Sequence, residues 1–150
     1  MKTTQFHQYH LEHAKLTEFA GYEMPLWYTT TMDEHLAVRN SSGIFDVSHM
    51  GRFMVRGGPA ASFLEGLVPT QVQKQSVGKE FYTLLLNDQA GIIDDLVLLR
   101  LGETEFLVVV NAANAGTDMD HIKSRGPPEG VEIEDLTSSS AMVAVQGPKA

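Results

Sequence analysis

The stretch Phe81–Val110, FYTLLLNDQAGIIDDLVLLRLGETEFLVVV, decides the fold of this protein. It contains three apolar runs of strand length, Phe81–Leu86, Ile92–Leu101 and Glu105–Val110, separated by connections of five and three residues. Parallel strands need a crossover of a dozen or more residues, whereas antiparallel strands can be joined by connections this short. The stretch therefore predicts an antiparallel meander.

Further helices and strands are predicted on both sides of the meander. Apolar patterning and the positions of glycine and proline predict helices at Thr31–Ser42, Pro59–Leu67 and Thr117–Ser124, and strands at Arg52–Arg56, Val131–Ile133 and Ala141–Gln146. Lys15–Tyr28 is expected to form two short extended pieces around Gly21, and Pro69–Gly78 a polar loop. The pattern indicates the α+β class, an antiparallel sheet with flanking helices.

Helix-end chemistry refines two of these boundaries. Thr31 is the expected N-cap of the first helix, with Glu34 completing a capping box, and Gly43 stands where a glycine commonly ends a helix. Gln146–Ala150 has the pattern of another helix start, with Pro148 in the first position. We therefore expect the sequence to be part of a longer chain.

The composition argues against several classes of protein. The formal net charge is -8 and the 11 Lys and Arg residues form no cluster, which does not suit a nucleic-acid binder. The absence of cysteine excludes disulfides and thiolate metal sites. His7, His10 and His13 recur at every third position, but no carboxylate–histidine motif accompanies them, so we assign no metal site. With no signal peptide and no membrane-length apolar run, we expect a soluble, cytoplasmic protein that binds no membrane.

Two adjacent carboxylates, Asp94 and Asp95, open the central run of the meander. Side chains alternate along a strand, so the two point to opposite faces and cannot share a proton with each other. Leu96–Leu99 places apolar side chains on both faces, which is typical of a strand covered on both sides, so at least one carboxylate enters an apolar layer. Two interpretations stay open from spacing alone. Each carboxylate caps a turn or meets Arg52 or Arg100, or one of them acts in an active site.

Asn111 and Asn114 follow the third apolar run. An amide can both donate and accept hydrogen bonds, which suits recognition of a heterocycle edge. For Asn114, capping of the next helix is the favoured interpretation. For Asn111, capping and ligand recognition are equally compatible with the sequence.

Five segments together resemble the T-protein family, the aminomethyltransferases of the glycine cleavage system. They occur in the family's order and near its spacing over essentially the whole chain: FAGYEMP (Phe19–Pro25), FDVSHMG (Phe45–Gly51), GIIDDL (Gly91–Leu96), VVNAAN (Val109–Asn114) and QGPKA (Gln146–Ala150). Each is weak alone, whereas the five together are specific. The resemblance implies that residues 1–150 form the N-terminal part of the family's folate-binding domain.

The resemblance also implies an activity. Members of the family transfer the one-carbon unit of the aminomethyl group on the lipoyl arm of H-protein to tetrahydrofolate, and ammonia is released. Asp95 matches the second aspartate of the family motif, the catalytic carboxylate beside the reacting nitrogens of the folate, which leaves Asp94 a structural role. A fixed negative charge suits this step, because carbon–sulfur cleavage and loss of ammonia pass through cationic species.

The implied folate-binding residues are Met50, Met54, Tyr82, Asp95 and Asn111. Methionine forms soft, adaptable walls for a flat ring, and Met54 stands where leucine is common in the family. The family's residues for the folate tail come later in its chains. We therefore expect these 150 residues alone to bind folate poorly and to be inactive.

Two related functions are kept as alternatives. One is a non-catalytic folate-binding relative of the iron–sulfur assembly type, and the other is the folate-accepting domain of a dimethylglycine- or sarcosine-oxidising enzyme. The intact motif at Asp94 and Asp95 favours a transferase over the first. The start at Met1, with no preceding flavin domain, argues against the second.

Overall fold

A computed structural model describes all residues of the chain, Met1–Ala150, as two compact units. Unit 1 comprises Met1–His49 and Thr137–Ala150, and unit 2 comprises Met50–Leu136. No helix in either unit is long and apolar enough to cross a lipid bilayer. The meander and the paired aspartates both belong to unit 2, so this unit holds the predicted site.

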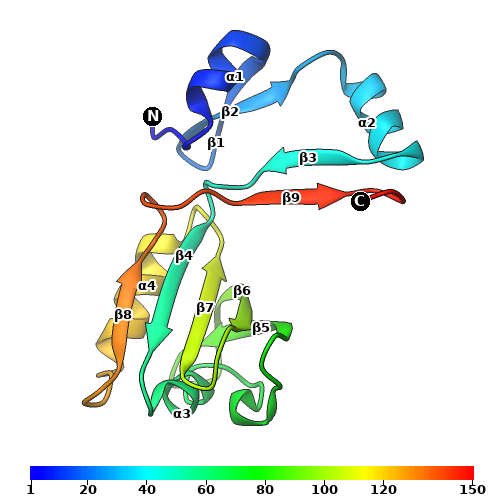
Figure 1. Cartoon of the computed structure of the whole chain (residues 1–150). Helices are drawn as coiled ribbons and strands as arrows, with labels where there is room; N and C mark the ends of the chain where they lie inside the picture. The colour runs from blue at the N-terminus through cyan, green and yellow to red at the C-terminus, as the bar shows by residue number, and fades with distance from the viewer. The chain divides into compact units, whose positions relative to one another are not determined.

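Unit 2 is built on a five-stranded antiparallel sheet in the order β5-β6-β7-β4-β8 (Figure 1). Its strands are β4 (Gly51–Arg56), β5 (Glu80–Leu86), β6 (Ile92–Arg100), β7 (Glu105–Val110) and β8 (Glu132–Asp135). Strands β5, β6 and β7 are the predicted meander, and their bounds differ from the prediction by at most one residue. The α+β class, with an antiparallel sheet and flanking helices, is confirmed.

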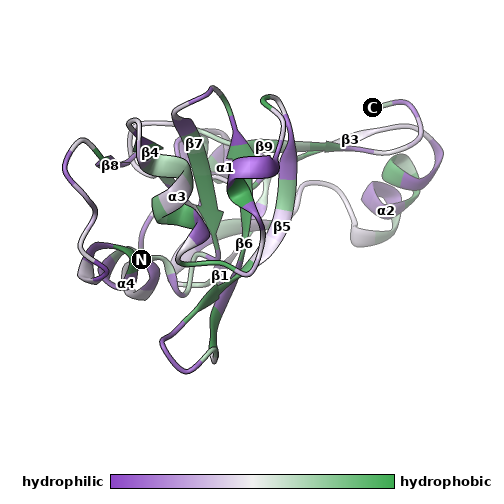
Figure 2. Ribbon diagram, turned by 90° about the horizontal axis from the view of Figure 1, so that it is seen from below, coloured by the Kyte–Doolittle hydropathy of each residue, from purple (hydrophilic) through white to green (hydrophobic).

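Both helices of unit 2 pack on the same face of this sheet. They are α3 (Ala60–Glu65) and α4 (Ala115–Ser124), and a short 3-10 turn, η1 (Val72–Lys74), lies within the predicted loop. The core joins alternate strand residues to the helices: Phe53, Val55, Leu96, Leu98, Phe106, Val108 and Val110 meet Ala60, Leu64, Met119 and Ile122. Figure 2 shows β7 apolar along most of its length. Each large apolar side chain buried here stabilises the fold by about 1.5–3 kcal/mol.

The opposite face of the sheet is only partly covered. From Asp94 to Arg100 of β6, buried side chains alternate with half-buried ones, the latter being Asp95, Val97 and Leu99. Tyr82, on the same face of β5, is 69% exposed. The prediction that β6 is covered on both sides is therefore wrong, because both helices lie on one face. The other face, called here the open face, offers half-exposed apolar side chains beside Asp95.

The sharp turn after β4 depends on a glycine. Gly57 has a φ of +124° and its backbone N–H donates to the Thr104 carbonyl at 2.9 Å. A Cβ at this position would lie 1.8 Å from the carbonyl oxygen of Gly130. Both the backbone conformation and this close approach exclude a side chain. The next residue, Gly58, has open space around its would-be Cβ.

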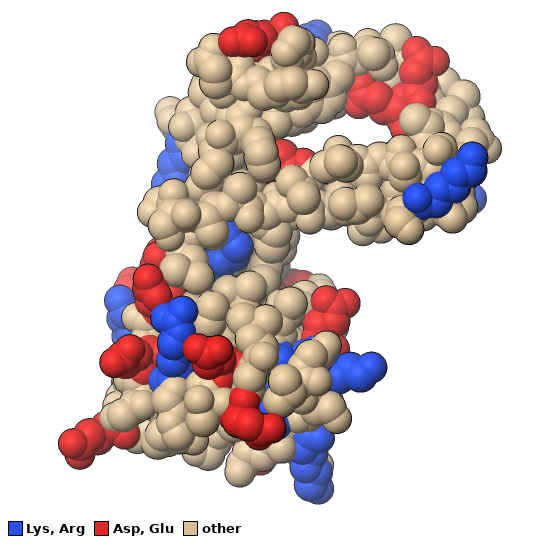
Figure 3. Space-filling view, viewed as in Figure 1, with Lys and Arg blue, Asp and Glu red and all other residues tan.

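Charged side chains of both signs are interspersed on the face of unit 2 seen in Figure 3. Arg56, at the end of β4, pairs with Glu105 of β7 at 3.4 Å and with Glu134 of β8 at 2.7 Å. All three side chains are more than a third exposed, so each pair contributes less than about 1 kcal/mol. These pairs lie at the opposite end of β4 and β7 from the predicted site.

Unit 1 contains two antiparallel strand pairs and two helices. The pairs are β1 (Lys15–Phe19) with β2 (Tyr22–Trp27), and β3 (Gly43–Asp46) with β9 (Val143–Gln146), which lie side by side in Figure 1. The helices are α1 (His7–His13) and α2 (Thr31–Asn40). The two extended pieces around Gly21 are confirmed, with Gly21 at a φ of +80°. The sequence analysis did not predict α1 or β3.

The predicted ends of α2 are wrong by a small margin. Its N-cap is Thr30 instead of Thr31, and the Thr30 hydroxyl accepts a hydrogen bond from the Asp33 N–H at 3.1 Å. Glu34 binds backbone N–H groups that precede the helix, at 2.6 and 2.7 Å. Gly43 does not end the helix, because it is already the first residue of β3. The local chemistry is of the predicted kind, but it acts one residue earlier.

Candidate functional site

Asp94 and Asp95 lie near the start of β6 and point to opposite faces, as predicted. Asp94 is 6% exposed on the core face, whereas Asp95 is half-buried on the open face. Asp95 is paired across the sheet with Leu84 of β5. None of the ion pairs in the chain involves either carboxylate. The interpretation in which these aspartates meet Arg52 or Arg100 is therefore wrong.

Two donors hold the Asp95 carboxylate from either side. The Tyr82 hydroxyl donates to Oδ2, and the Asn111 side-chain amide donates to Oδ1 at 3.1 Å. The hydrogen bond to Asp95 is the main reason why the pKa of Tyr82 lies above its ordinary value, so this hydroxyl stays a donor. A carboxylate can accept about four hydrogen bonds. Each Asp95 oxygen therefore keeps a lone pair for a ligand.

Three of the predicted site residues meet in this way, whereas Met54 lies farther along the sheet. Met54 lies on the open face of β4 opposite Leu107, which is in turn opposite Leu99. Four residues separate the registers of Leu99 and Asp95, which is about 13 Å along the strands. Met50 immediately precedes β4, and its carbonyl accepts a hydrogen bond from Arg52 at 2.7 Å. Met54 therefore shares the face of Asp95 without touching it.

Tyr82→Phe tests whether the hydroxyl orients Asp95. For the gene-encoded protein, in the transfer reaction that the family resemblance implies, we expect turnover to fall about threefold to tenfold. This corresponds to loss of one hydrogen bond to a charged group at a solvent-accessible position. The free energy of unfolding should stay within about 0.5 kcal/mol, because the side chain is 69% exposed. Steady-state kinetics and urea denaturation of the variant provide both values. Unchanged turnover would show that Asn111 alone fixes the carboxylate.

Asp94 is held by amides. Its Oδ1 accepts hydrogen bonds from Asn111 at 3.0 Å and from Asn114 at 2.9 Å. Burial by itself raises the pKa of Asp94, but hydrogen bonds from Asn111, Asn114 and Asp118 outweigh it, and the pKa lies below its ordinary value. Asn114 is the N-cap residue of α4, yet its side chain makes no capping hydrogen bond. The predicted capping role of the Asn114 side chain is therefore wrong, since this amide binds Asp94.

A third carboxyl group, Asp118 on α4, faces Asp94 and is fully buried. Apart from the contact between these two carboxyl groups, no N–H or hydroxyl donor of the chain reaches either Asp118 oxygen or Asp94 Oδ2. Burial, followed by the hydrogen bond with Asp94 and the charges of Asp94 and Asp95, raises the pKa of Asp118 to about 7. Two facing carboxyl oxygens need a proton between them, and it resides on Asp118 because Asp94 already has two amide donors.

The sequence analysis missed Asp118, although a signal was present. Asp118 lies three residues after Ala115 and four before Ile122, both of which pack in or against the core. This spacing places the carboxyl on the apolar face of the helix. An acidic residue at such a position is costly unless it is neutral or paired.

The buried carboxyl of Asp118 makes folding stability pH-dependent. The pKa is about 7 in the folded chain against 3.8 for an ordinary aspartate. The folded state therefore binds more protons than the unfolded state between these values, and stability is lost as pH rises toward and through 7. We expect a loss of roughly 2 to 3 kcal/mol between pH 5 and pH 8 from this group. Urea denaturation of the native protein and Asp118→Asn should show this loss only with the aspartate. The same pH dependence in both proteins would contradict it.

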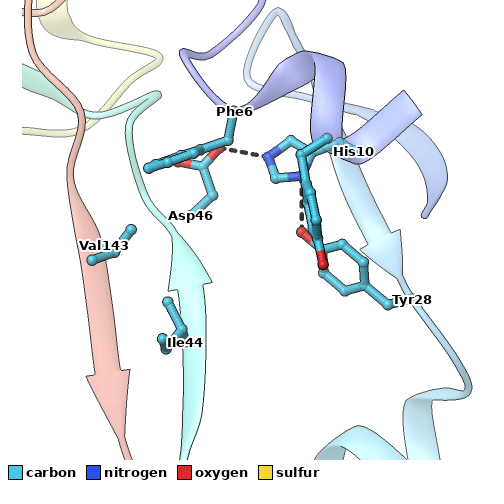
Figure 4. Close-up of a pocket in the computed structure, with 7 residues that line it drawn as sticks. Phe6, His10, Tyr28, Ile44, Asp46 and Val143 are labelled. Carbon is cyan, nitrogen blue, oxygen red and sulfur yellow. Dashed lines mark hydrogen bonds and ion pairs between the residues drawn. The ribbon is translucent and has the colours of Figure 1, made fainter. Parts of the chain in front are cut away.

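A second polar cluster lies in unit 1. His10 of α1, which is 2% exposed, contacts Asp46 Oδ2 through Nε2 and the Tyr28 hydroxyl through Nδ1, both at 2.8 Å (Figure 4). Burial by itself raises the pKa of Asp46, but hydrogen bonds from Ser48, Thr4 and His10 outweigh it and the pKa is lowered. Aromatic and aliphatic side chains complete a pocket of about 320 Å³. The cluster ties α1 to β3, two elements that the sequence analysis missed. No group of His, Asp and Glu in the chain is arranged to hold a metal ion.

Comparison with known proteins agrees with the T-protein resemblance. The aminomethyltransferase of Thermus thermophilus is 46% identical over 151 residues, and that of Thermotoga maritima is 45% identical. Each match covers the whole chain but only 43% and 42% of the relative, so the chain spans less than half of their length. The crystal structure of glycine cleavage system aminomethyltransferase T from Bartonella henselae superposes with a TM-score of 0.91 at 37% identity, over 99% of this chain and 41% of that one.

The match to a family model is equally extensive. Residues 6–150 match the model described as the GCVT N-terminal domain. The matched region includes all of unit 2 and therefore Asp95 with its two donors. Because nearly the whole sequence is matched, the chain belongs to the GCVT N-terminal domain family.

Proposed function

We propose that this chain supplies the catalytic carboxylate of a tetrahydrofolate-dependent aminomethyltransferase of the glycine cleavage system. The reaction moves the one-carbon unit of aminomethyl-lipoyl H-protein to tetrahydrofolate and releases ammonia. The observation that carries the proposal is the Asp95 carboxylate, which Tyr82 and Asn111 hold on the open face of the sheet. The reaction class is supported by relatives of 45–46% identity that are named aminomethyltransferases.

The residues around Asp95 fit a reduced pterin. A pterin edge carries N–H donors, and the Asp95 oxygens keep lone pairs that can accept from them. Half-buried Val97 and Leu99 continue from Asp95 along the open face and give a flat ring an apolar surface. Tyr82 adds an exposed aromatic ring. When bound, tetrahydrofolate supplies the nitrogens that receive the one-carbon unit, and we propose that Met50 and Met54 extend its binding surface.

Asp95 has two tasks in this proposal. Its negative charge stabilises positive charge on the carbon and nitrogen of the aminomethyl group as the carbon–sulfur bond breaks. One of its oxygens accepts a proton from the nitrogen that attacks. Tyr82 and Asn111 keep the carboxylate oriented before the reaction begins, so little reorganisation is needed. The side-chain N–H groups of Asn111 are occupied by Asp94 and Asp95, so we propose that Asn111 contacts the folate through its side-chain carbonyl oxygen.

A reconstituted assay tests this function with the protein as its gene encodes it. The reaction contains aminomethyl-loaded, lipoylated H-protein and tetrahydrofolate, and both ammonia and methylenetetrahydrofolate are measured. We expect the two products in equal amounts, and neither product when H-protein is omitted. Folate binding without product would favour the non-catalytic folate-binding relative. Absence of both binding and product would contradict the proposal.

A further inference from the structure

The proposed function gives no role to the acid pair behind the site, Asp94 and Asp118. Both carboxyl groups are buried, at 6% and 0% exposure, and no cation pairs with either of them. Burying two carboxyl groups together costs several kcal/mol unless they hold a proton between them. An apolar residue at position 118 would fill the same core without that cost. The pair therefore calls for an explanation beyond packing.

A continuous hydrogen-bonded chain links this pair to Asp95. The Asn111 amide lies 3.0 Å from Asp94 Oδ1, 3.1 Å from the Asp95 carbonyl oxygen and 3.1 Å from Asp95 Oδ1. Its two N–H groups are thus shared among three acceptors, all on Asp94 and Asp95. Rotation of the Asp94 carboxylate would move one of the three acceptors that fix this amide. Asn114 also binds Asp94 Oδ1, whereas Asp94 Oδ2 is buried and, like both oxygens of the neighbouring Asp118, receives no N–H donor.

We propose that Asp118 is a positioning residue for Asp95. The proton that Asp118 shares with Asp94 locks the Asp94 carboxylate, the locked carboxylate fixes the Asn111 amide, and the amide orients Asp95 on the open face. This inference rests on the proposed catalytic function of Asp95. It assigns α4 a part in the site, although no α4 side chain reaches the open face.

The charged groups around Asp118 support a shared proton. Asp94 faces it from β6, and the charges of Asp94 and Asp95 both raise the pKa of Asp118. On α4 itself, Asp120 and Lys123 are exposed, and His121 is turned to the Leu86 carbonyl at 3.0 Å. Among the buried cations of the sheet, Arg100 binds carbonyls such as that of Gln75 at 2.6 Å, and Arg52 belongs to the opposite face. No positive group is placed to stabilise a second negative charge beside Asp94.

Two substitutions separate the proton from the shape of the side chain. Asp118→Asn keeps the size and offers an N–H donor to Asp94 Oδ2, but it cannot titrate. Asp118→Leu is apolar and larger, and it offers no donor. In the reconstituted reaction of the gene-encoded protein, we expect Asp118→Asn to keep kcat within about threefold of the native value. We expect Asp118→Leu to lose about tenfold or more in kcat with little change in KM, because a misplaced catalytic group slows the reaction without weakening binding.

Nuclear magnetic resonance gives a readout that does not depend on turnover. The carboxyl carbon of Asp118, assigned by its disappearance in Asp118→Asn, should titrate near neutral pH. The side-chain amide resonances of Asn111 should shift with the same midpoint in the native protein and show no such step in Asp118→Asn. The inference would be overturned if Asp118 titrates near pH 4. It would also be overturned if the Asn111 side-chain amide resonances do not shift as Asp118 titrates. Native kcat in a folded Asp118→Leu protein would overturn it as well.

The outcomes also separate this inference from the proposed function. If Asp118→Leu fails to fold, the titrations of the native protein and of Asp118→Asn still decide the matter. One outcome is normal turnover in Asp95→Asn while the Asn111 amide still shifts with the titration of Asp118. This outcome would contradict the catalytic proposal for Asp95, and the buried polar network would then have no positioning role. The other outcome is loss of turnover in Asp95→Asn while the Asn111 amide does not shift with the titration of Asp118. This outcome would support a catalytic Asp95 and contradict a positioning role for Asp118.

Discussion

Asp95→Asn is expected to lower turnover about 10²-fold or more, because the amide has the shape of the carboxylate but neither its charge nor its basicity. The electrostatic stabilisation of a cationic transition state is lost, and so is the proton acceptor. Folding should change little, since Asp95 is half-buried and forms no ion pair. The measurement is kcat for the gene-encoded protein with loaded H-protein and tetrahydrofolate.

Asp120→Asn is a suitable control for this experiment. Asp120 is an exposed aspartate on α4, so its substitution removes the same charge from the surface of the same unit. We expect native turnover in the control. A similar loss in both variants would point to a general effect of charge, and near-normal turnover in Asp95→Asn would remove Asp95 from the mechanism.

Gly57→Ala is expected to destabilise unit 2 by about 4 kcal/mol or more, which places it among the exceptionally large effects of single substitutions. The added Cβ would lie 1.8 Å from the Gly130 carbonyl oxygen, and the φ of +124° is one that side chains with a Cβ rarely adopt. The turn that leads β4 toward α3 and the segment before β8 would both have to shift. Urea denaturation, or the yield of folded protein if the loss is complete, measures the effect.

Gly58→Ala is the matched control at the next position. Its new Cβ meets no atom within 4 Å, and its φ is not in the left-handed region. We expect the free energy of unfolding to stay within about 1 kcal/mol of the native value. Any change should be an increase, because alanine lowers the conformational entropy of the unfolded chain. Equal stability of the two variants would mean that the turn at Gly57 rearranges without cost.

The helices and strands that are marked by a local pattern of apolar residues could be predicted from the sequence. Strands β5, β6 and β7 are long apolar runs with short connections, so periodicity and connection length determined them. Strand β3 is short, and its partner β9 lies far along the chain, so no local pattern reveals it. The one-sided burial of β6 was also hidden, because apolar residues on both faces give the same sequence whether or not the second face is covered. The positions of α3 and α4 in the sequence do not show which face of the sheet they cover.

The candidate site was predictable in part for the same reason. Strand alternation alone separates Asp94 from Asp95, and the structure bears that out. The meeting of Asp95 with Tyr82 and Asn111 depends on register across three strands, and in the sequence analysis it came from the family resemblance. Asp118 was not predictable from the polar residues at strand ends, because it lies within a helix. The sequence signal for Asp118 is its spacing from the apolar residues of the same helix, which places an acidic side chain on the apolar face of α4.

The order of the two units along the chain has a consequence for synthesis in the cell. Unit 2 is one continuous segment, whereas unit 1 is made of segments that precede and follow it. The sheet that carries Asp95 can therefore form while translation is still under way, but Ile44 and Phe45 must wait for residues 143–146 to emerge before their backbone finds its partner. During that interval an apolar strand edge is unsatisfied. If translation pauses before residues 143–146 are made, we expect the nascent chain to bind chaperones or to aggregate through this strand.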